Sequence, residues 1–240
     1  MKKIYLAALT LAMTACVSND DLNPVDNYGY IDVNVSNDPV MVTRATVSDI
    51  SSWTIKANNY NLNDNNKVPA GSYTVIVSNV PSEEDLYTDG NWGDAFYKGE
   101  AMNVEVTAGK TETVSIDCGK AKNSRLKVEF KLNENALSSY YVTPDRHLVF
   151  NKDNMNEKLA YYNVGTEVNY TLNYSHTTGQ KTKTGNIKFE DPAKEYKLKI
   201  ESNDNGTITI TEITYDDSFD QVESESITFD AATGEQVTNQ

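Results

Sequence analysis

The residue best suited to covalent chemistry is Cys16. It ends the sequence Met13-Thr14-Ala15-Cys16, which follows a basic pair, Lys2 and Lys3, and a short, largely apolar run over residues 4–13. A basic head, a short apolar stretch and small residues before a cysteine are typical of a bacterial lipoprotein signal. The run is too short to span a membrane, which takes about 20 residues in a helix. We therefore expect cleavage before Cys16 and lipid attachment to its thiol; a buried core helix is the alternative.

Other residue types that serve as nucleophiles or metal ligands are few. The histidines, His147 and His176, have no second histidine or cysteine at ligand spacing, so ordinary surface histidines are expected rather than metal ligands. Cys118 lies on an apolar face with Val114 and Ile116, which predicts a buried, inert thiol rather than a nucleophile with a histidine base. We expect no metal, no cofactor and no catalytic residue.

Two further patterns resemble ligand loops without meeting their spacing. Gly109-Lys110-Thr111 ends like a phosphate-binding loop, but Val104 stands where that motif needs a glycine, and a hairpin turn explains it better. The acidic segments 89–94 and 216–220 offer oxygen ligands for calcium, yet neither fits a twelve-residue calcium loop. Solvated acidic loops are the simpler prediction.

The most suggestive surface feature is aromatic. Trp92, Phe96 and Tyr97 lie in a glycine-containing loop, and the pairs 140–141 and 161–162 are adjacent tyrosines whose rings must point to opposite faces of a strand. Packing in the core, or as a plug of the loop, is the expected role of these rings. The alternative is that one ring of each pair is exposed, and Trp92 and Tyr97 are the candidate residues for stacking on a ligand such as a sugar.

The charge of the chain excludes one class of partner. Loss of Lys2 and Lys3 with the leader leaves 19 basic residues against 35 acidic ones, a net charge of −16. Nucleic-acid binding begins with lysine and arginine neutralising phosphates, so no nucleic-acid partner is expected. The same charge keeps the body of the protein from anionic membrane surfaces, so only a lipid on Cys16 is expected to hold it there.

Period-two alternation of apolar and polar residues dominates the chain after the leader, and it predicts antiparallel sheets with one solvated face. The alternating segments are 31–35, 102–106, 113–118, 126–132, 167–174 and 196–201. Residues 71–79 are apolar on both sides and predict a central strand. The pattern slips at Ile208, Ile210 and Ile213, which predicts a bulge near Thr211 and Glu212. Residues 151–158 are expected to form one helical turn.

These patterns predict an all-β chain of two tandem antiparallel β-sandwich domains, separated within the basic segment Gly119–Arg125. The expected divisions are a signal peptide, a lipidated cysteine with a flexible stalk, an N-terminal sandwich, a C-terminal sandwich and a flexible tail. Their bounds are 1–15, 16–27, 28–120, 121–230 and 231–240.

Several motifs in this order resemble the fimbrillin-like surface lipoproteins of Bacteroides and its relatives, and most closely an uncharacterised domain-of-unknown-function branch of that group. The resemblance covers nearly the whole mature chain. Besides the leader and Cys118, it rests on Gly29-Tyr-Ile-Asp-Val-Asn-Val35, Val42-Thr-Arg-Ala-Thr46, Val68-Pro-Ala-Gly-Ser-Tyr-Thr-Val75, Tyr97-Lys-Gly99 and Val104-Glu-Val-Thr-Ala-Gly-Lys-Thr-Glu-Thr-Val114.

The resemblance implies transthyretin-like sandwiches, a place on the outer face of the outer membrane, and no enzymatic activity. Asp20 and Asp21 resemble the surface-export tag that follows the lipid cysteine in such proteins. In pilus-forming relatives a protease cuts between an arginine and an alanine and removes a first strand, whose groove a neighbouring subunit then fills. Arg44-Ala45 matches that cleavage site, and residues 31–35 would be the removed strand.

Three functional hypotheses follow. The leading one is a non-enzymatic, lipid-anchored surface protein with an adhesion or fimbria-related role, whose partners are pilus subunits or other surface proteins. The second is a surface glycan-binding lipoprotein that uses exposed aromatic side chains. The third, an enzyme, would need a buried charged cleft with a perturbed carboxylate or histidine.

Overall fold

The computed structural model describes residues 27–36, 50–80, 92–93, 95–135, 137–144, 148–204 and 206–237. These residues form sixteen β-strands and one short 3-10 helix, η1 (Ile50–Ser52). The predicted all-β class is confirmed. Within these ranges, no helix is long and apolar enough to cross a lipid bilayer.

The N-terminal half, β1–β7, contains two sheets. One has the order β4-β1-β7, and the other has the order β3-β2-β5-β6. The strand bounds are β1 (Tyr28–Ser36), β2 (Thr54–Ala57), β3 (Tyr60–Asn61), β4 (Lys67–Pro69), β5 (Gly71–Ser78), β6 (Lys98–Val106) and β7 (Thr111–Asp117).

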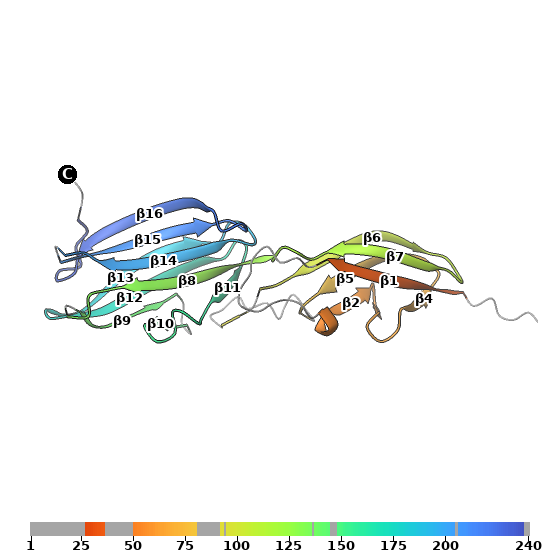
Figure 1. Ribbon diagram of the computed structural model, residues 1–240, viewed down its shortest axis with the longest axis horizontal. Helices are drawn as coiled ribbons and strands as arrows, with labels where there is room; N and C mark the ends of the chain where they lie inside the picture. The colour runs from red at the N-terminus through yellow and green to blue at the C-terminus, as the bar shows by residue number, and fades with distance from the viewer. Residues whose placement is uncertain are drawn as a thin grey trace, which may run out of the picture.

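The C-terminal half, β8–β16, also contains two sheets, with the orders β10-β9-β12-β13 and β11-β8-β14-β15-β16. The bounds are β8 (Asn123–Lys131), β9 (Leu137–Thr143), β10 (Phe150–Asn151), β11 (Ala160–Asn163), β12 (Glu167–His176), β13 (Gly179–Lys188), β14 (Glu195–Ser202), β15 (Thr207–Tyr215) and β16 (Gln221–Asp230). Figure 1 shows the two halves at opposite ends of the long axis, with β1 beginning at the end farther from β8–β16.

The alternation seen in the sequence gives the longer central strands one buried side, as β8 and β12 illustrate. In β8, Leu126, Val128 and Phe130 are buried whereas Lys131 is exposed. In β12, the inward positions Val168, Leu172 and Tyr174 are buried in the same manner. Burial of these apolar rows is the main source of favourable free energy for such sheets.

Strand direction differs from the antiparallel prediction at two places. β1 runs parallel to β7, with Tyr30 opposite Thr111 and Ser36 opposite Asp117. β14 runs parallel to β8, with Glu195 opposite Arg125. Parallel neighbours need a long crossover connection, and side-chain alternation has the same period in both kinds of ladder. The sheets are therefore mixed, which alternation alone does not reveal.

The predicted bulge near Thr211 and Glu212 is wrong. The ladder between β14 and β15 stays regular there, with Lys199 opposite Thr211 and Leu198 opposite Glu212. Ile213 is instead buried on the face opposite that of Ile208 and Ile210. The carboxylate side chain of Glu212 therefore lies on the same side of β15 as Ile208 and Ile210.

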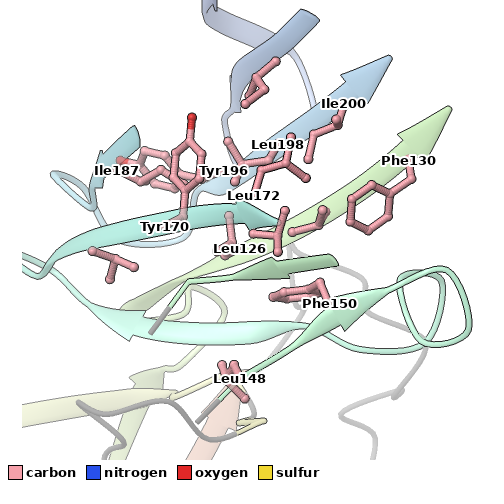
Figure 2. Close-up of a cluster of buried hydrophobic side chains, with 14 of the residues drawn as sticks. Leu126, Phe130, Leu148, Phe150, Tyr170, Leu172, Ile187, Tyr196, Leu198 and Ile200 are labelled. Carbon is pink, nitrogen blue, oxygen red and sulfur yellow. The ribbon is translucent and has the colours of Figure 1, made fainter. Parts of the chain in front are cut away.

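Two separate apolar cores lie in the two halves. The N-terminal core draws on both sheets of its half, with Ile31 and Ile116 from one sheet and Val75 and Val104 from the other. The C-terminal core likewise joins its two sheets, and Figure 2 shows Leu172 of β12 close to Leu126 and Leu198 of the facing sheet. As predicted, Cys118 is buried; it belongs to the N-terminal core.

Residues 151–158 and residues 231–237 are both held by backbone hydrogen bonds. Residues 151–158 form consecutive turns in which Met155 N donates to Asn151 O and Lys158 N donates to Asn154 O, so a helical turn is present as predicted. Residues 231–237, predicted to be a flexible tail, fold back so that Gln236 pairs with Phe229 and Val237 N donates to Thr228 O.

Candidate functional sites

The predicted processing residues, Cys16, Arg44 and Ala45, lie outside the described residues. β1 lies between them in the sequence. Its geometry therefore bears most directly on what processing at Arg44 would do.

β1 is paired along most of its length on one side and for only its first third on the other. β7 accompanies it from Tyr30 to Ser36, whereas β4 pairs only with Tyr28–Tyr30. In the part of the chain that the structure describes, no strand pairs with Asp32–Ser36 on the side opposite β7. The second part of β1 thus forms an open sheet edge, and such edges recruit further strands.

One glycine in β1 and one in β6 lie where the backbone of a neighbouring segment approaches closely. A Cβ atom on Gly29 would lie 2.5 Å from Thr107 O, and one on Gly99 would lie 2.5 Å from Asp117 O. Because both neighbours are backbone oxygens, only glycine fits at either position.

Trp92, one of the two candidate stacking residues, packs against the C-terminal half. Its ring meets that of Phe150 edge-on, with centroids 4.9 Å apart, and Lys158 Nζ lies 5.8 Å from its centroid. Its backbone forms an isolated bridge with Ala160 in β11. The side chain is half-buried, so only part of the ring is available to a ligand.

Tyr97, the other candidate stacking residue, lies in the N-terminal core, in agreement with core packing, and its ring is not available to a ligand. It is 2% exposed and stacks on Trp53 with centroids 5.9 Å apart. Burial raises the pKa of its hydroxyl. The backbone of Tyr97 forms an isolated bridge with Ala121, which belongs to the same core. This pairing keeps the ring inside the N-terminal half.

The tyrosine pairs behave differently from each other. Tyr161 and Tyr162 are both buried, in agreement with core packing, so neither offers an exposed ring. Tyr141 is 39% exposed, whereas its neighbour Tyr140 is half-buried against Phe130. Only the pair in β9 therefore presents one exposed ring.

The residue types that could support catalysis are engaged elsewhere. Burial raises the pKa of the Cys118 thiol to about 11, so it remains protonated and weakly reactive at neutral pH. His147 lies outside the described residues, and His176 Nδ1 accepts a hydrogen bond from Thr178 N. Within the described ranges, no group of three histidine, cysteine or acidic side chains is arranged to hold a metal ion.

The acidic loop 216–220 uses its carboxylates internally. Asp216 Oδ1 accepts hydrogen bonds from the backbone N–H groups of Ser218 and Asp220, and Asp217 pairs with Lys120 at 2.6 Å. The calcium alternative has no support here. Most of the other acidic segment, 89–94, lies outside the described residues.

Glu212 is a perturbed carboxyl group that the sequence did not single out. It lies opposite Glu225 on β16 and lines a cavity of about 280 Å³ with Glu223 and Tyr196. Desolvation raises its pKa to about 7, with further contributions from Glu225 and Glu223. Regular alternation along the strand places residue 212 on the core side with Ile208 and Ile210, and this was the signal that the sequence offered. The bulge expected near Thr211 and Glu212 would have turned residue 212 away from that side.

The chain matches one protein family over most of its length. The family described as "Domain of unknown function (DUF4493)" matches residues 23–231, which confirms the resemblance to a domain-of-unknown-function branch. No curated protein matches the chain.

Three solved structures are similar to this chain at low identity. A "putative cell adhesion protein" from Bacteroides ovatus is 13% identical, with 82% of this chain and 96% of that chain covered and a TM-score of 0.41. A second one, from Bacteroides fragilis, is 10% identical, with 77% and 96% covered and a TM-score of 0.37. A fimbrial assembly protein from Parabacteroides distasonis is 10% identical, with 81% and 97% covered and a TM-score of 0.36. These values are too low to transfer a ligand or partner to this chain.

Proposed function

This chain belongs to the DUF4493 family, and from that premise we propose that it is a non-enzymatic lipoprotein of the outer-membrane surface with an adhesion or fimbria-related role. The lipid anchor is Cys16, and the protein faces the cell exterior. Its two halves are tandem β-sandwich domains, residues 28–120 and 121–230. Two cores, each drawing mainly on the two sheets of its own half, support this division, although Ala193 of the C-terminal half also belongs to the N-terminal core.

The observation on which the proposal rests is the open edge of β1. Asp32–Ser36 are paired only with β7 among the described strands, and Ile31 is buried in the core. If the chain were cut after Arg44 and β1 were released, β4 and β7 would lose the strand between them. An apolar slot would remain, which an extended segment of another subunit can fill by main-chain pairing.

The direction of the molecule also supports surface display. β1 begins at one end of the long axis and β9–β16 lie toward the other (Figure 1). A lipid on Cys16 would attach the protein by the end where β1 begins. The C-terminal half would then extend away from the membrane.

Limited digestion of the purified full chain with an arginine-specific protease tests the assembly part. Cleavage after Arg44 is expected before cleavage after Arg125, because Arg125 is only 4% exposed and its guanidinium binds Glu195 at 2.6 Å. The trimmed protein should then form dimers or ladders in native gels. Arg44→Lys is the matched control, since it keeps the charge and removes the cleavage site. Resistance of Arg44, or a trimmed product that stays monomeric at high concentration, would contradict assembly by strand exchange.

Fractionation of cells tests the anchor separately. Cys16→Ser removes the thiol that would carry lipid, so the variant should leave the membrane fraction and keep its leader. Cys118→Ser is the control, because that thiol is buried and should not affect localisation. A Cys16→Ser protein that is processed and membrane-bound would refute the lipoprotein proposal.

Glycan binding is the second candidate function. The observation that favours it is the aromatic pair in β9, where Tyr141 is exposed and Tyr140 borders a polar pocket. Trp92 contributes less than expected because its ring is partly covered by Phe150.

A further inference from the structure

A polar pocket of about 370 Å³ lies where β9 begins. Its walls come from three segments: Glu134 ahead of the strand, the first four residues of β9 (Leu137–Tyr140), and Asn151, Lys152 and Asp153. Pockets that bind small molecules occupy about 300–1,000 Å³, so this volume suits a small ligand.

Hydrogen bonds between side chains and backbone fix the walls of the pocket. Asn151 Oδ1 accepts from Asp153 N at 3.0 Å, and Asn154 Oδ1 accepts from Asn151 N at 2.9 Å. Asn154 Nδ2 also donates to Val149 O at 2.8 Å. An ion pair between Lys152 and Glu134 joins the opposite walls. A ligand would therefore meet groups that are already positioned, which lowers the entropy lost on binding.

The lining groups suit a molecule with many hydroxyls. Ser138 and Ser139 contribute hydroxyls, and Asp153 contributes an acceptor carboxylate. The Tyr140 ring rests on Phe130 with centroids 5.1 Å apart, so it is a fixed apolar surface beside these polar groups. Burial is the largest cause that raises the pKa of the Tyr140 hydroxyl, and the hydroxyl donates to the Glu134 carboxylate, so Tyr140 offers a ligand its ring and not its hydroxyl. A sugar ring presents hydroxyls at its rim and C–H groups on its face, and it matches both kinds of surface.

The charge of the pocket selects among sugars. Lys152 and Glu134 neutralise each other, and Asp153 remains as one unbalanced negative charge. An anionic sugar would be repelled, whereas a neutral one would accept and donate hydrogen bonds freely.

We propose that this pocket, formed by Glu134, Ser138–Tyr140 and Asn151–Asp153, binds a neutral saccharide of one or two rings. The inference rests on the proposed surface location. It assigns ligand binding to the C-terminal half, which lies at the end of the molecule away from the start of β1 (Figure 1). The ligand class follows from the Ser138 hydroxyl, the adjacent Tyr140 ring and the Asp153 carboxylate, since the Ser139 hydroxyl donates to Ser175 Oγ at 2.9 Å.

Titration calorimetry on the purified full chain with lactose, maltose and cellobiose tests this inference, with 3′-sialyllactose as the anionic probe. At least one neutral disaccharide should bind, and 3′-sialyllactose should bind at least tenfold more weakly than lactose or not at all. Asp153→Ala, which removes the carboxylate, and Tyr140→Ala, which removes the ring, should each weaken binding at least tenfold. Glu157→Ala is the matched control, because Glu157 is exposed in the same turn and does not line the pocket.

Each remaining outcome overturns the inference. Failure of all three neutral disaccharides to bind would show that the pocket is not a saccharide site, while the fractionation of Cys16→Ser would still decide the surface location independently. Binding that survives both pocket variants would place the sugar elsewhere. Equal binding of 3′-sialyllactose and lactose would refute the role of Asp153. A thermal melt of each variant confirms that it is folded before titration.

Discussion

The two halves of the molecule build their cores from different side chains. In the described residues, the N-terminal core has 15 buried members, of which Trp53, Tyr73 and Tyr97 are aromatic. The C-terminal core has 22, and eight of them are phenylalanine or tyrosine. Because large rings bury more apolar area per residue, the C-terminal half should gain more free energy from packing.

The N-terminal half depends instead on close approach of backbones. Gly29 and Gly99 lie so near to backbone oxygens that no side chain fits. The comparison teaches that the C-terminal half relies more on ring packing, whereas the N-terminal half relies more on two positions where a backbone oxygen leaves no room for a side chain. A half that is held by fewer large contacts is also the one whose first strand can most readily be exchanged.

Removal of one central ring should produce the largest effect. Phe189 is fully buried between Tyr162, at 4.6 Å, and Tyr196, at 4.7 Å between ring centroids. Phe189→Ala should lower the free energy of unfolding of the C-terminal half by about 3–5 kcal/mol. Hydrogen exchange followed by mass spectrometry would localise the loss to β8–β16. Tyr97→Ala removes a buried ring from the other core, and an equal loss there would break the distinction between the halves.

A methyl group on Gly99 should be the next most damaging change. Gly99→Ala would push a Cβ atom against Asp117 O and Ile116 Cγ2, each 2.5 Å away, and should destabilise the N-terminal half by about 3 kcal/mol, the upper end for overpacking. Gly185→Ala is the matched variant in β13, where the neighbour is the far end of the Tyr170 side chain and the loss should be smaller. Urea unfolding of both variants checks the order, and a larger loss at Gly185 would reverse the argument.

Trp92 tests whether the halves are independent. Although it precedes β6 of the N-terminal half, its ring packs on Phe150 of the C-terminal core. Trp92→Ala should destabilise β10 and β11 by about 2 kcal/mol and leave β1–β7 unchanged. Hydrogen exchange at β10 and β11 measures the effect, and Trp92→Phe, which retains a ring, should restore part of it. Unchanged exchange at both strands would mean that the contact contributes nothing.

The smallest expected effect concerns Glu212 and depends on pH. Its carboxyl group has a pKa of about 7 in the folded protein, above the ordinary 4.5, so the folded state binds the proton more tightly than the unfolded state. The stability of the C-terminal half should therefore fall as the pH rises from about 4.5 to about 7, and remain lower above that range.

Glu212→Gln removes this penalty. It should raise the free energy of unfolding by about 1 kcal/mol at pH 8, after allowance for the partial solvation of the side chain, and change little at pH 4. Urea unfolding at the two pH values gives the comparison, with the exposed Glu157→Gln as the control. A gain of equal size at both values would show that the effect is not due to ionisation.

The sequence predicted local structure better than it predicted pairing. Leu126, Val128 and Phe130 alternate with lysine and glutamate, and their burial follows directly from that pattern. The burial of Cys118 followed in the same way. The parallel pairing of β1 with β7 could not be predicted, because it depends on how distant segments meet and not on the period of either strand.

The locations of the candidate site residues could not be predicted from the sequence. Trp92 and Tyr97 are five positions apart in one loop, yet one ring packs on the C-terminal half and the other enters the N-terminal core. Aromatic residues suit both a core and a surface, so composition could not separate them. The pocket beside Tyr140 joins segments more than ten positions apart, which no local pattern reveals.

The parallel pairing of β1 and β7 has a mechanical consequence. In Figure 1, β1 runs along the long axis, so tension between an anchored N-terminus and a load on the distal half would act along the strand. The ladder from Tyr30 to Ser36 would then be sheared, with its hydrogen bonds resisting together and not opening one after another. β1, the strand that the proposed cleavage after Arg44 would release, would therefore withstand pulling while the chain remains intact.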